Sequence, residues 1–152
     1  MPVFGGKGFD ELTVGERFRD ALTVTEAHIV QAAGLFGDFN PVHLNERFAG
    51  QTIFGGRIAH GYFTSSWMAA IVGMAFAGTG FAYLEHTCRF KAPVRPGDTV
   101  EGEWTVMELL SKPKHEGGIV VLAGTCRNQH GDTVAVLDAK ILVKDRAAAP
   151  AS

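Results

Sequence analysis

The feature that most constrains the fold is an apolar run in the middle of the chain, at about residues 61–77. Its hydrophobic residues fall on nearly all sides of a helix, which is typical of a helix buried in a core. The run is too short to span a bilayer, which needs about 20 apolar residues, and the N-terminus lacks the pattern of a signal peptide. We therefore predict a buried central helix, no membrane association and a cytoplasmic location.

Strand-like segments follow this run. They are rich in Val, Thr, Leu and aromatic residues, and they lie at residues 81–90, 99–109, 119–128 and 133–143. An earlier strand is expected near residues 17–24. Helices followed by antiparallel strands indicate an α+β fold. We predict a single antiparallel, curved sheet of five to six strands wrapped around the long central helix.

The first third of the chain carries helix signals. A helix is expected at residues 26–36, because apolar residues recur there at helical period and Thr23 and Glu26 have the spacing of a capping box. Pro41 disfavours helical backbone at Asn40, so residues 37–43 are expected to be a turn or an extended piece. A short helix is expected near residues 45–49, and a polar loop at residues 112–118.

The length of 152 residues predicts one domain. We expect a flexible N-terminus over residues 1–8, a domain over residues 9–145 and a disordered tail over residues 146–152. The formal net charge of −2 argues against a nucleic-acid partner, which requires a strongly basic surface. Cys88 and Cys126 are expected to be reduced core residues, since two distant cysteines do not make a disulfide framework.

The segment from Asp38 to His43 is the strongest candidate for chemistry, because it brings a carboxylate, the amide of Asn40 and an imidazole into six residues. On a helix, positions five apart diverge by about 140 degrees, whereas a Pro-containing turn lets them converge. A carboxylate and an imidazole together can polarise one water and act as general acid and base. The same residue types also make ordinary surface turns.

A second candidate is His60-Gly61 at the start of the apolar run, because a helix N-terminus offers unpaired N–H groups to a developing oxyanion. Gly61 could equally serve close packing. Ser66 either bonds to the carbonyl four residues back or lines a site near the helix start. No metal-binding motif is present; Asp38, His43 and His60 are the only candidate ligands, and we expect no metal and no bound cofactor.

Residues 38–43, with the sequence Asp-Phe-Asn-Pro-Val-His, resemble the hydratase motif of the (R)-specific enoyl-CoA hydratases, in the MaoC-like dehydratase family. The sequence Ile-Ala-His-Gly at residues 58–61 and the helix bearing Ser66 match the next segment of that family. Residues 90–98 are similar to a strand and turn that recur there. The resemblance covers about residues 9–143.

This resemblance implies the hotdog fold, with single units that pair as homodimers or higher homo-oligomers. It implies reversible hydration of a trans-2-enoyl-CoA to the (R)-3-hydroxyacyl-CoA, with the thioester as substrate and Asp38 and His43 as the catalytic dyad. Asn40 and Ser66 would support the dyad, and Gly61 and His60 would bind the substrate and its oxyanion. The aromatic residues that could shape an acyl pocket for a short or medium chain are Phe36, Phe39, Phe54, Tyr62, Phe63 and Trp67. Most of them could instead simply pack in the core.

Two other functions remain open from the sequence. The first is a hotdog acyl-CoA thioesterase, which usually places a carboxylate on or beside the central helix. Residues 61–77 contain no acidic residue, which disfavours this alternative. The second is a non-catalytic subunit that binds an acyl thioester, which the intact set of Asp38, Asn40, His43 and Gly61 disfavours.

Overall fold

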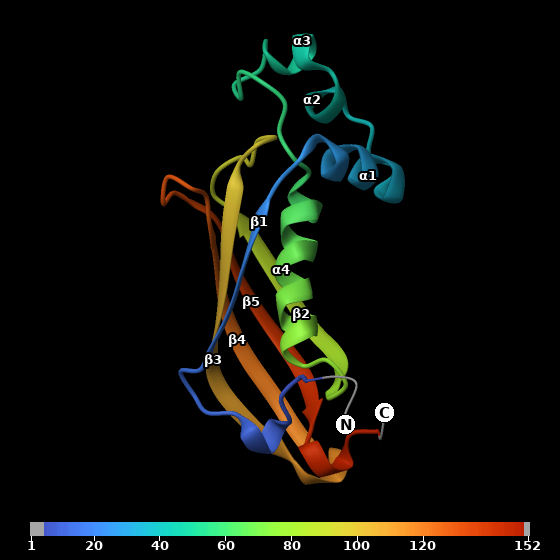
Figure 1. Ribbon diagram of the computed structural model, residues 1–152, viewed down its shortest axis with the longest axis vertical. Coiled ribbons are helices and arrows are strands. Elements are labelled where there is room, and N and C mark those ends of the chain that lie inside the picture. Colours follow the sequence, from blue (N-terminus) through green and yellow to red (C-terminus); the bar gives the residue numbers. More distant parts are fainter. Residues whose placement is uncertain (1–4, 151–152) are drawn as a thin grey trace.

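The computed structural model describes residues 5–150, in which one antiparallel sheet curves around one long helix (Figure 1). The five strands lie in the order β1-β3-β4-β5-β2. Their bounds are β1 Arg17–Thr23, β2 Gly80–Phe90, β3 Thr99–Lys112, β4 Gly117–Arg127 and β5 Thr133–Lys144. The helices are α1 Glu26–Phe36, α2 Pro41–Leu44, α3 Glu46–Ala49 and α4 Gly61–Ala75, with short 3-10 turns at Phe9–Glu11, Pro113–His115 and Arg146–Ala148. The predicted α+β hotdog fold is confirmed.

The middle of helix α4 packs directly against the sheet. The fully buried indole of Trp104 on β3 donates a hydrogen bond of 2.8 Å from Nε1 to the carbonyl of Met68 on α4. A Cβ at Gly102 would lie 2.6 Å from the side chains of Met68 and Ile71, and one at Gly124 would lie 2.8 Å from the Trp104 ring. The two glycines therefore let the sheet approach both the helix and the indole closely.

The prediction that α4 is buried on all sides is wrong for the single chain. One face packs into the core through Thr64, Met68, Ile71 and Val72. On the opposite face, Tyr62 is 66% exposed and Met74 is 73% exposed. No described residue of the same chain covers this second apolar face. The helix is therefore apolar on both faces but buried on only one of them.

Helices α1, α2 and α3 cluster at one end of the molecule, beyond the N-terminus of α4 (Figure 1). Helix α1 has the predicted bounds, but its cap is Thr25 with His28 and not Thr23 with Glu26, since Thr23 still pairs with Thr99 in the sheet. The extended piece expected up to His43 is too long, because Pro41 begins helix α2. Proline suits the first helical position, where its missing N–H costs nothing.

The hairpin of β3 and β4 has more regular structure than the expected polar loop at residues 112–118. Strands β3 and β4 extend across the expected polar loop, so that only a 3-10 turn at Pro113–His115 joins them. The domain limits remain a prediction, and residues 1–4 and 151–152 lie outside the described range. Within it, the N–H of Lys7 donates to the carbonyl of Ala75, and Arg146 bonds to Asp10 and Glu11.

Two further expectations concern the cysteines and the membrane. Cys88 and Cys126 are both free thiols, as predicted, and burial raises the pKa of the Cys126 thiol to about 12. Across residues 5–150, the helices are all too short or too polar to cross a membrane.

Candidate active site

The turn after α1 brings the carboxylate and the imidazole together. Gly37 ends the helix in the left-handed conformation, with a φ of 72°, and turns the chain so that Asp38 follows at once. His43 is the third residue of α2, and its Nε2 is 3.7 Å from Oδ2 of Asp38. The imidazole is largely buried, and the carboxylate is 38% exposed. The convergence of these two residues, which we call the dyad, is as the sequence predicts.

Asn40 builds the turn between the two members of the dyad. Its backbone N–H donates to Oδ1 of Asp38 at 3.1 Å, and its side-chain Oδ1 accepts a hydrogen bond of 3.2 Å from the N–H of Val42. The second bond caps the N-terminus of α2, while Asn40 itself keeps an extended ψ of 131°. Asn40 therefore holds the carboxylate on one side and starts the helix that carries His43 on the other.

The backbone also determines the tautomer of His43. Its Nδ1 lies 2.8 Å from the carbonyl oxygen of Ile58. A carbonyl oxygen can only accept, so Nδ1 carries the proton and the neutral ring leaves the lone pair on Nε2. Nε2 is the nitrogen that faces Asp38. The pair therefore presents a carboxylate and an unprotonated ring nitrogen side by side, and both can accept hydrogen bonds from one water.

Arg57 anchors the segment that supplies this carbonyl. Its guanidinium donates to Glu26 at the start of α1, with Nη2 2.9 Å from Oε2, and to Glu46 on α3, with Nε 2.7 Å from Oε2. The hydrogen bonds that Arg57 donates to Glu26, and to a lesser extent to Glu46, raise the pKa of Arg57 above its ordinary value. Because Ile58 follows directly, this ion pair fixes the segment against which His43 is oriented.

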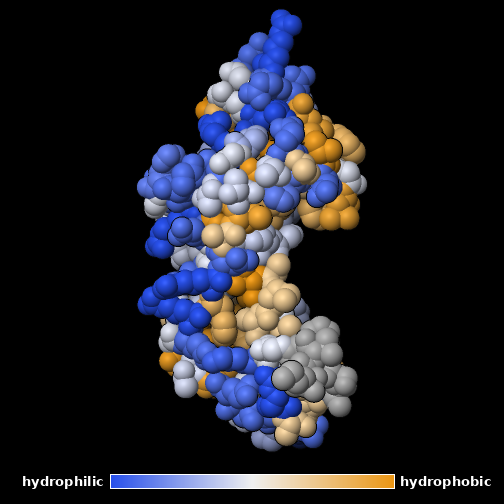
Figure 2. Space-filling model, viewed as in Figure 1, coloured by the Kyte–Doolittle hydropathy of each residue, from blue (hydrophilic) through white to orange (hydrophobic). Residues whose placement is uncertain are grey.

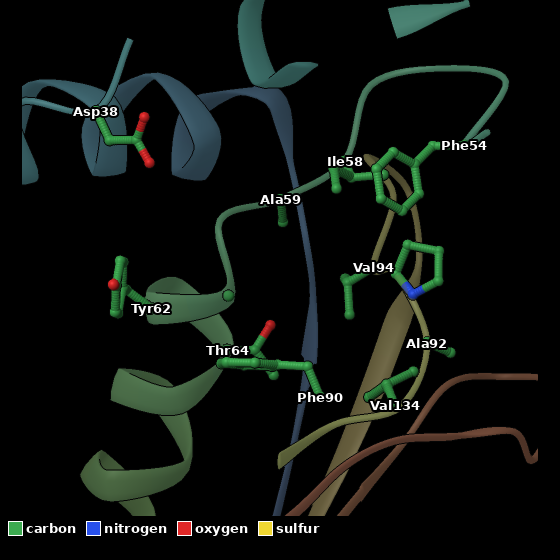
Figure 3. A pocket seen from close by; sticks show the side chains of 12 residues that line it. Asp38, Phe54, Ile58, Ala59, Tyr62, Thr64, Phe90, Ala92, Val94 and Val134 are labelled. Carbon is green, nitrogen blue, oxygen red and sulfur yellow. The ribbon is translucent and has the colours of Figure 1, made fainter. Parts of the chain in front are cut away.

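A pocket of about 360 Å³ opens beside the dyad. Asp38 reaches it from the turn, Tyr62 and Thr64 from α4, and Val94 from the segment after β2 (Figure 3). The lining consists of Asp38, Phe54, Ile58, Ala59, Gly61, Tyr62, Thr64, Phe90, Ala92, Pro93, Val94 and Val134. A largely apolar cleft with a carboxylate at its edge has the make-up of a small-molecule site.

Of the remaining predicted site residues, one lines the pocket and two do not. Gly61 lines the pocket as the first residue of α4, so the unpaired N–H groups of the first turn lie beside it. His60, the cap of α4, is only 1% exposed and is absent from the lining. Ser66 is exposed on α4 and does not line the pocket. It lies on a different face of the helix from Gly61.

Only some of the aromatic residues expected to shape the acyl pocket line it. Of the six aromatic residues proposed for it, Phe54 and Tyr62 line the pocket; Phe36, Phe39, Phe63 and Trp67 do not. Phe90 and Val134 were missed as lining residues. They lie at the end of β2 and the start of β5, and only the strand order brings them to the N-terminus of α4.

Gly61 offers a local test of the pocket. A Cβ there would lie 2.8 Å from the Phe90 ring, so Gly61→Ala displaces that ring into the pocket. We expect the KM for the enoyl thioester that the resemblance implies as substrate to rise about tenfold, roughly the effect of a lost methylene-sized contact. Gly73→Ala is the matched control, because it lies on the same helix with no atom within 4 Å of its Cβ position. Steady-state kinetics of both variants measure the difference, and equal KM values would contradict it.

Asp38, His43 and His60 also form the cluster best placed for a metal, with candidate ligand atoms within 4.8 Å of one another. Nδ1 of His43 bonds to the carbonyl of Ile58, and Nε2 of His60 lies 2.9 Å from the carbonyl of Asp38. These bonds leave Nε2 of His43, Nδ1 of His60 and the Asp38 carboxylate as the candidate ligand atoms. Three protein ligands are the number that a catalytic zinc site uses. The expectation that no metal binds here stays a prediction.

Comparison with known proteins gives the chain its relatives. A protein-family profile described as "MaoC like domain" matches residues 12–125. The chain belongs to this MaoC-like family. A 3-hydroxybutyryl-CoA dehydratase of Methylorubrum extorquens is 40% identical over 90% of this chain and 82% of its own length. An (R)-specific enoyl-CoA hydratase of Rhodospirillum rubrum is 40% identical over 70% of this chain and 74% of its own length.

The solved structures agree with the fold of this MaoC-like protein. An R-hydratase from Pseudomonas aeruginosa, in the unliganded form, superposes with a TM-score of 0.82 at 32% sequence identity. The match covers 93% of this chain and 88% of the other. The hotdog architecture is therefore common to this chain and to an R-hydratase, and the resemblance seen in residues 38–43 extends over the whole fold.

Proposed function

We propose that the protein is a hydratase that reversibly adds water to a trans-2-enoyl-CoA and forms the (R)-3-hydroxyacyl-CoA. The observation that carries this proposal is the dyad, in which Nε2 of His43 and the carboxylate of Asp38 lie 3.7 Å apart. Asp38 lines the pocket, and His43 lies buried behind it. Relatives named as an (R)-specific enoyl-CoA hydratase and a 3-hydroxybutyryl-CoA dehydratase support the reaction class.

The reaction follows from the two acceptors of the dyad. One water bound by both Asp38 and His43 loses a proton to the dyad as its hydroxyl bonds to the β carbon of the substrate. The dyad then returns one proton to the α carbon, so it ends in its starting protonation state. Such general acid–base catalysis contributes about 100- to 10,000-fold. Dehydration is the same path in reverse.

The N-terminus of α4 supplies the electrostatic part of the mechanism. As the hydroxyl adds, negative charge develops on the thioester oxygen. The N–H of Gly61 lies in the first turn of a 15-residue helix, where N–H groups are unpaired and the helix dipole is positive. A donor aimed at such an oxygen is worth about 100-fold or more in rate. The missing side chain at Gly61 leaves room for the Phe90 ring, which lines the pocket.

The substrate we propose is a coenzyme A thioester with a short acyl chain. Apolar side chains, including Phe54, Phe90 and Val134, close a pocket of about 360 Å³ around the acyl group. The four-carbon acyl group in the name of the Methylorubrum relative agrees with this size. The thioester is a substrate, so the proposal requires no resident cofactor or metal.

We also propose a homodimer formed through α4 and β2. Strand β2 lies at the edge of the sheet, and apolar side chains gather over α1 and the middle of the molecule (Figure 2). Exposed apolar residues of α1, α4 and β2 include Phe36, Tyr62, Met74, Phe81 and Leu84. Large exposed apolar surface supports an interface there. Light scattering is expected to give twice the mass of one chain, and a monomer at micromolar concentration would contradict this assembly.

The test of function is hydration of crotonyl-CoA, followed as loss of the enoyl-thioester absorbance. We expect activity that EDTA does not reduce, and turnover that falls for acyl chains longer than ten carbons. Release of free thiol from the same substrates measures thioesterase activity. Thiol release without hydration would support the thioesterase instead, and binding of acyl-CoA with neither reaction would support a non-catalytic subunit.

A further inference from the structure

His60 lies directly behind the dyad and outside the pocket lining. It is the cap of α4, and it is 1% exposed. Its Nε2 lies 2.9 Å from the backbone carbonyl oxygen of Asp38. Its ring stacks on the ring of His43, with centroids 3.8 Å apart and an angle of 28° between the planes. A single side chain therefore contacts both members of the dyad.

We propose that His60 is a positioning residue that holds the Asp38 main chain, and with it the dyad, in register with the N-terminus of α4. This inference rests on the proposed hydratase function. It differs from the role expected from the sequence, in which His60 binds substrate, because the buried ring does not reach the pocket.

The hydrogen bond determines how His60 is protonated. The carbonyl of Asp38 can only accept, so Nε2 of His60 must carry the proton. The other nitrogen, Nδ1, is buried without a hydrogen-bond partner among the described residues. A buried polar atom without a partner is unfavourable, and a phenyl ring would fill the same space without that cost. The useful part of His60 is therefore the Nε2–H group.

The position of His60 in the chain explains what this bond achieves. His60 immediately precedes Gly61, whose N–H is the proposed oxyanion donor, and Asp38 is separated from them by more than 20 residues of turn and short helix. The bond between Nε2 and the Asp38 carbonyl ties the carboxylate to the same backbone that presents Gly61. The bond therefore sets the distance between the Asp38 carboxylate, which binds the water, and the Gly61 N–H, which binds the thioester oxygen.

Two substitutions separate this role from simple space filling. His60→Gln keeps a side-chain N–H that can reach the Asp38 carbonyl but removes the ring. His60→Phe keeps the stacked ring but removes the donor. We expect kcat for crotonyl-CoA hydration to fall about 100-fold in His60→Phe, the effect of a displacement of roughly 1 Å, and to recover at least tenfold in His60→Gln.

KM is expected to change little in both variants, because His60 does not line the pocket. The matched controls are His130→Phe and His130→Gln, at an exposed position, and both should retain full activity. A Phe variant as active as the Gln variant, or more active, would overturn the proposal, since it would show that only the volume of the ring matters.

A measurement on the unaltered protein does not depend on activity. The nitrogen-15 chemical shifts of the His60 ring are expected to show a protonated Nε2 and an unprotonated Nδ1. The opposite tautomer would overturn the proposal, because the Asp38 carbonyl would then receive no hydrogen bond. If the protein does not hydrate crotonyl-CoA or any other enoyl-CoA, the proposed function fails, and the ring shifts still decide whether His60 holds Asp38.

Discussion

Asp38→Asn is expected to lower kcat for crotonyl-CoA hydration by about 100- to 10,000-fold, the range of general acid–base catalysis. The variant keeps a side-chain oxygen that can accept the hydrogen bond from the N–H of Asn40, 3.1 Å away in the parent protein. It loses the negative charge and presents an amide in place of an acceptor to the bound water. The chemical step therefore fails while the turn survives.

Asp20→Asn is the matched control. Asp20 lies exposed on β1, where its carboxylate likewise accepts a bond from a nearby backbone N–H, that of Ala21 at 2.8 Å. This control is expected to keep the turnover of the parent protein. Melting temperatures and acyl-CoA binding should stay close to the parent values in both variants. Turnover unchanged in Asp38→Asn would remove the dyad from the mechanism.

His43→Asn is expected to have an effect of similar size. The amide nitrogen of Asn takes the place of Nδ1 and can still donate to the carbonyl of Ile58. The substitution removes Nε2, the nitrogen that faces Asp38 at 3.7 Å. The variant therefore preserves the orienting bond and deletes the acceptor, which isolates the part of the ring that the mechanism uses.

The control and the double variant sharpen this second test. His115→Asn changes an exposed histidine and should not alter turnover. Because Asp38 and His43 act on one water, their effects are not additive. The double variant is expected to be about as slow as the slower single variant. Independent losses that multiply would show that the two residues act in separate steps.

The local signals of the sequence were sufficient for much of the fold. Helical period predicts the limits of α1, and enrichment in Val, Thr, Leu and aromatic residues predicts all five strands to within a few residues. The convergence of Asp38 and His43 was also accessible, because both lie in one short segment whose turn is dictated by Gly37 and Asn40. Nothing in these arguments required knowledge of distant contacts.

The features that the sequence does not reveal depend on contacts between distant segments. The supporting role expected of Ser66 stays a prediction. Ser66 does not line the pocket, because packing of Met68 and Ile71 against the sheet sets the rotation of α4. Phe90 reaches the pocket through the strand order. His60 looked like a substrate ligand because it adjoins Gly61, and only the fold shows that its Nε2 meets the Asp38 carbonyl 22 residues earlier in the chain.

The seat of α4 on the sheet links folding to turnover. The bond from Trp104 to Met68 and the close approach at Gly102 fix where the middle of the helix lies along its own axis. A rigid helix transmits any sliding at that seat to its first residue, Gly61. Reacting groups must be held to within about 0.5 Å. A folded core tolerates displacements larger than this without unfolding. Substitutions at this contact between α4 and the sheet are therefore expected to reduce turnover before they unfold the protein.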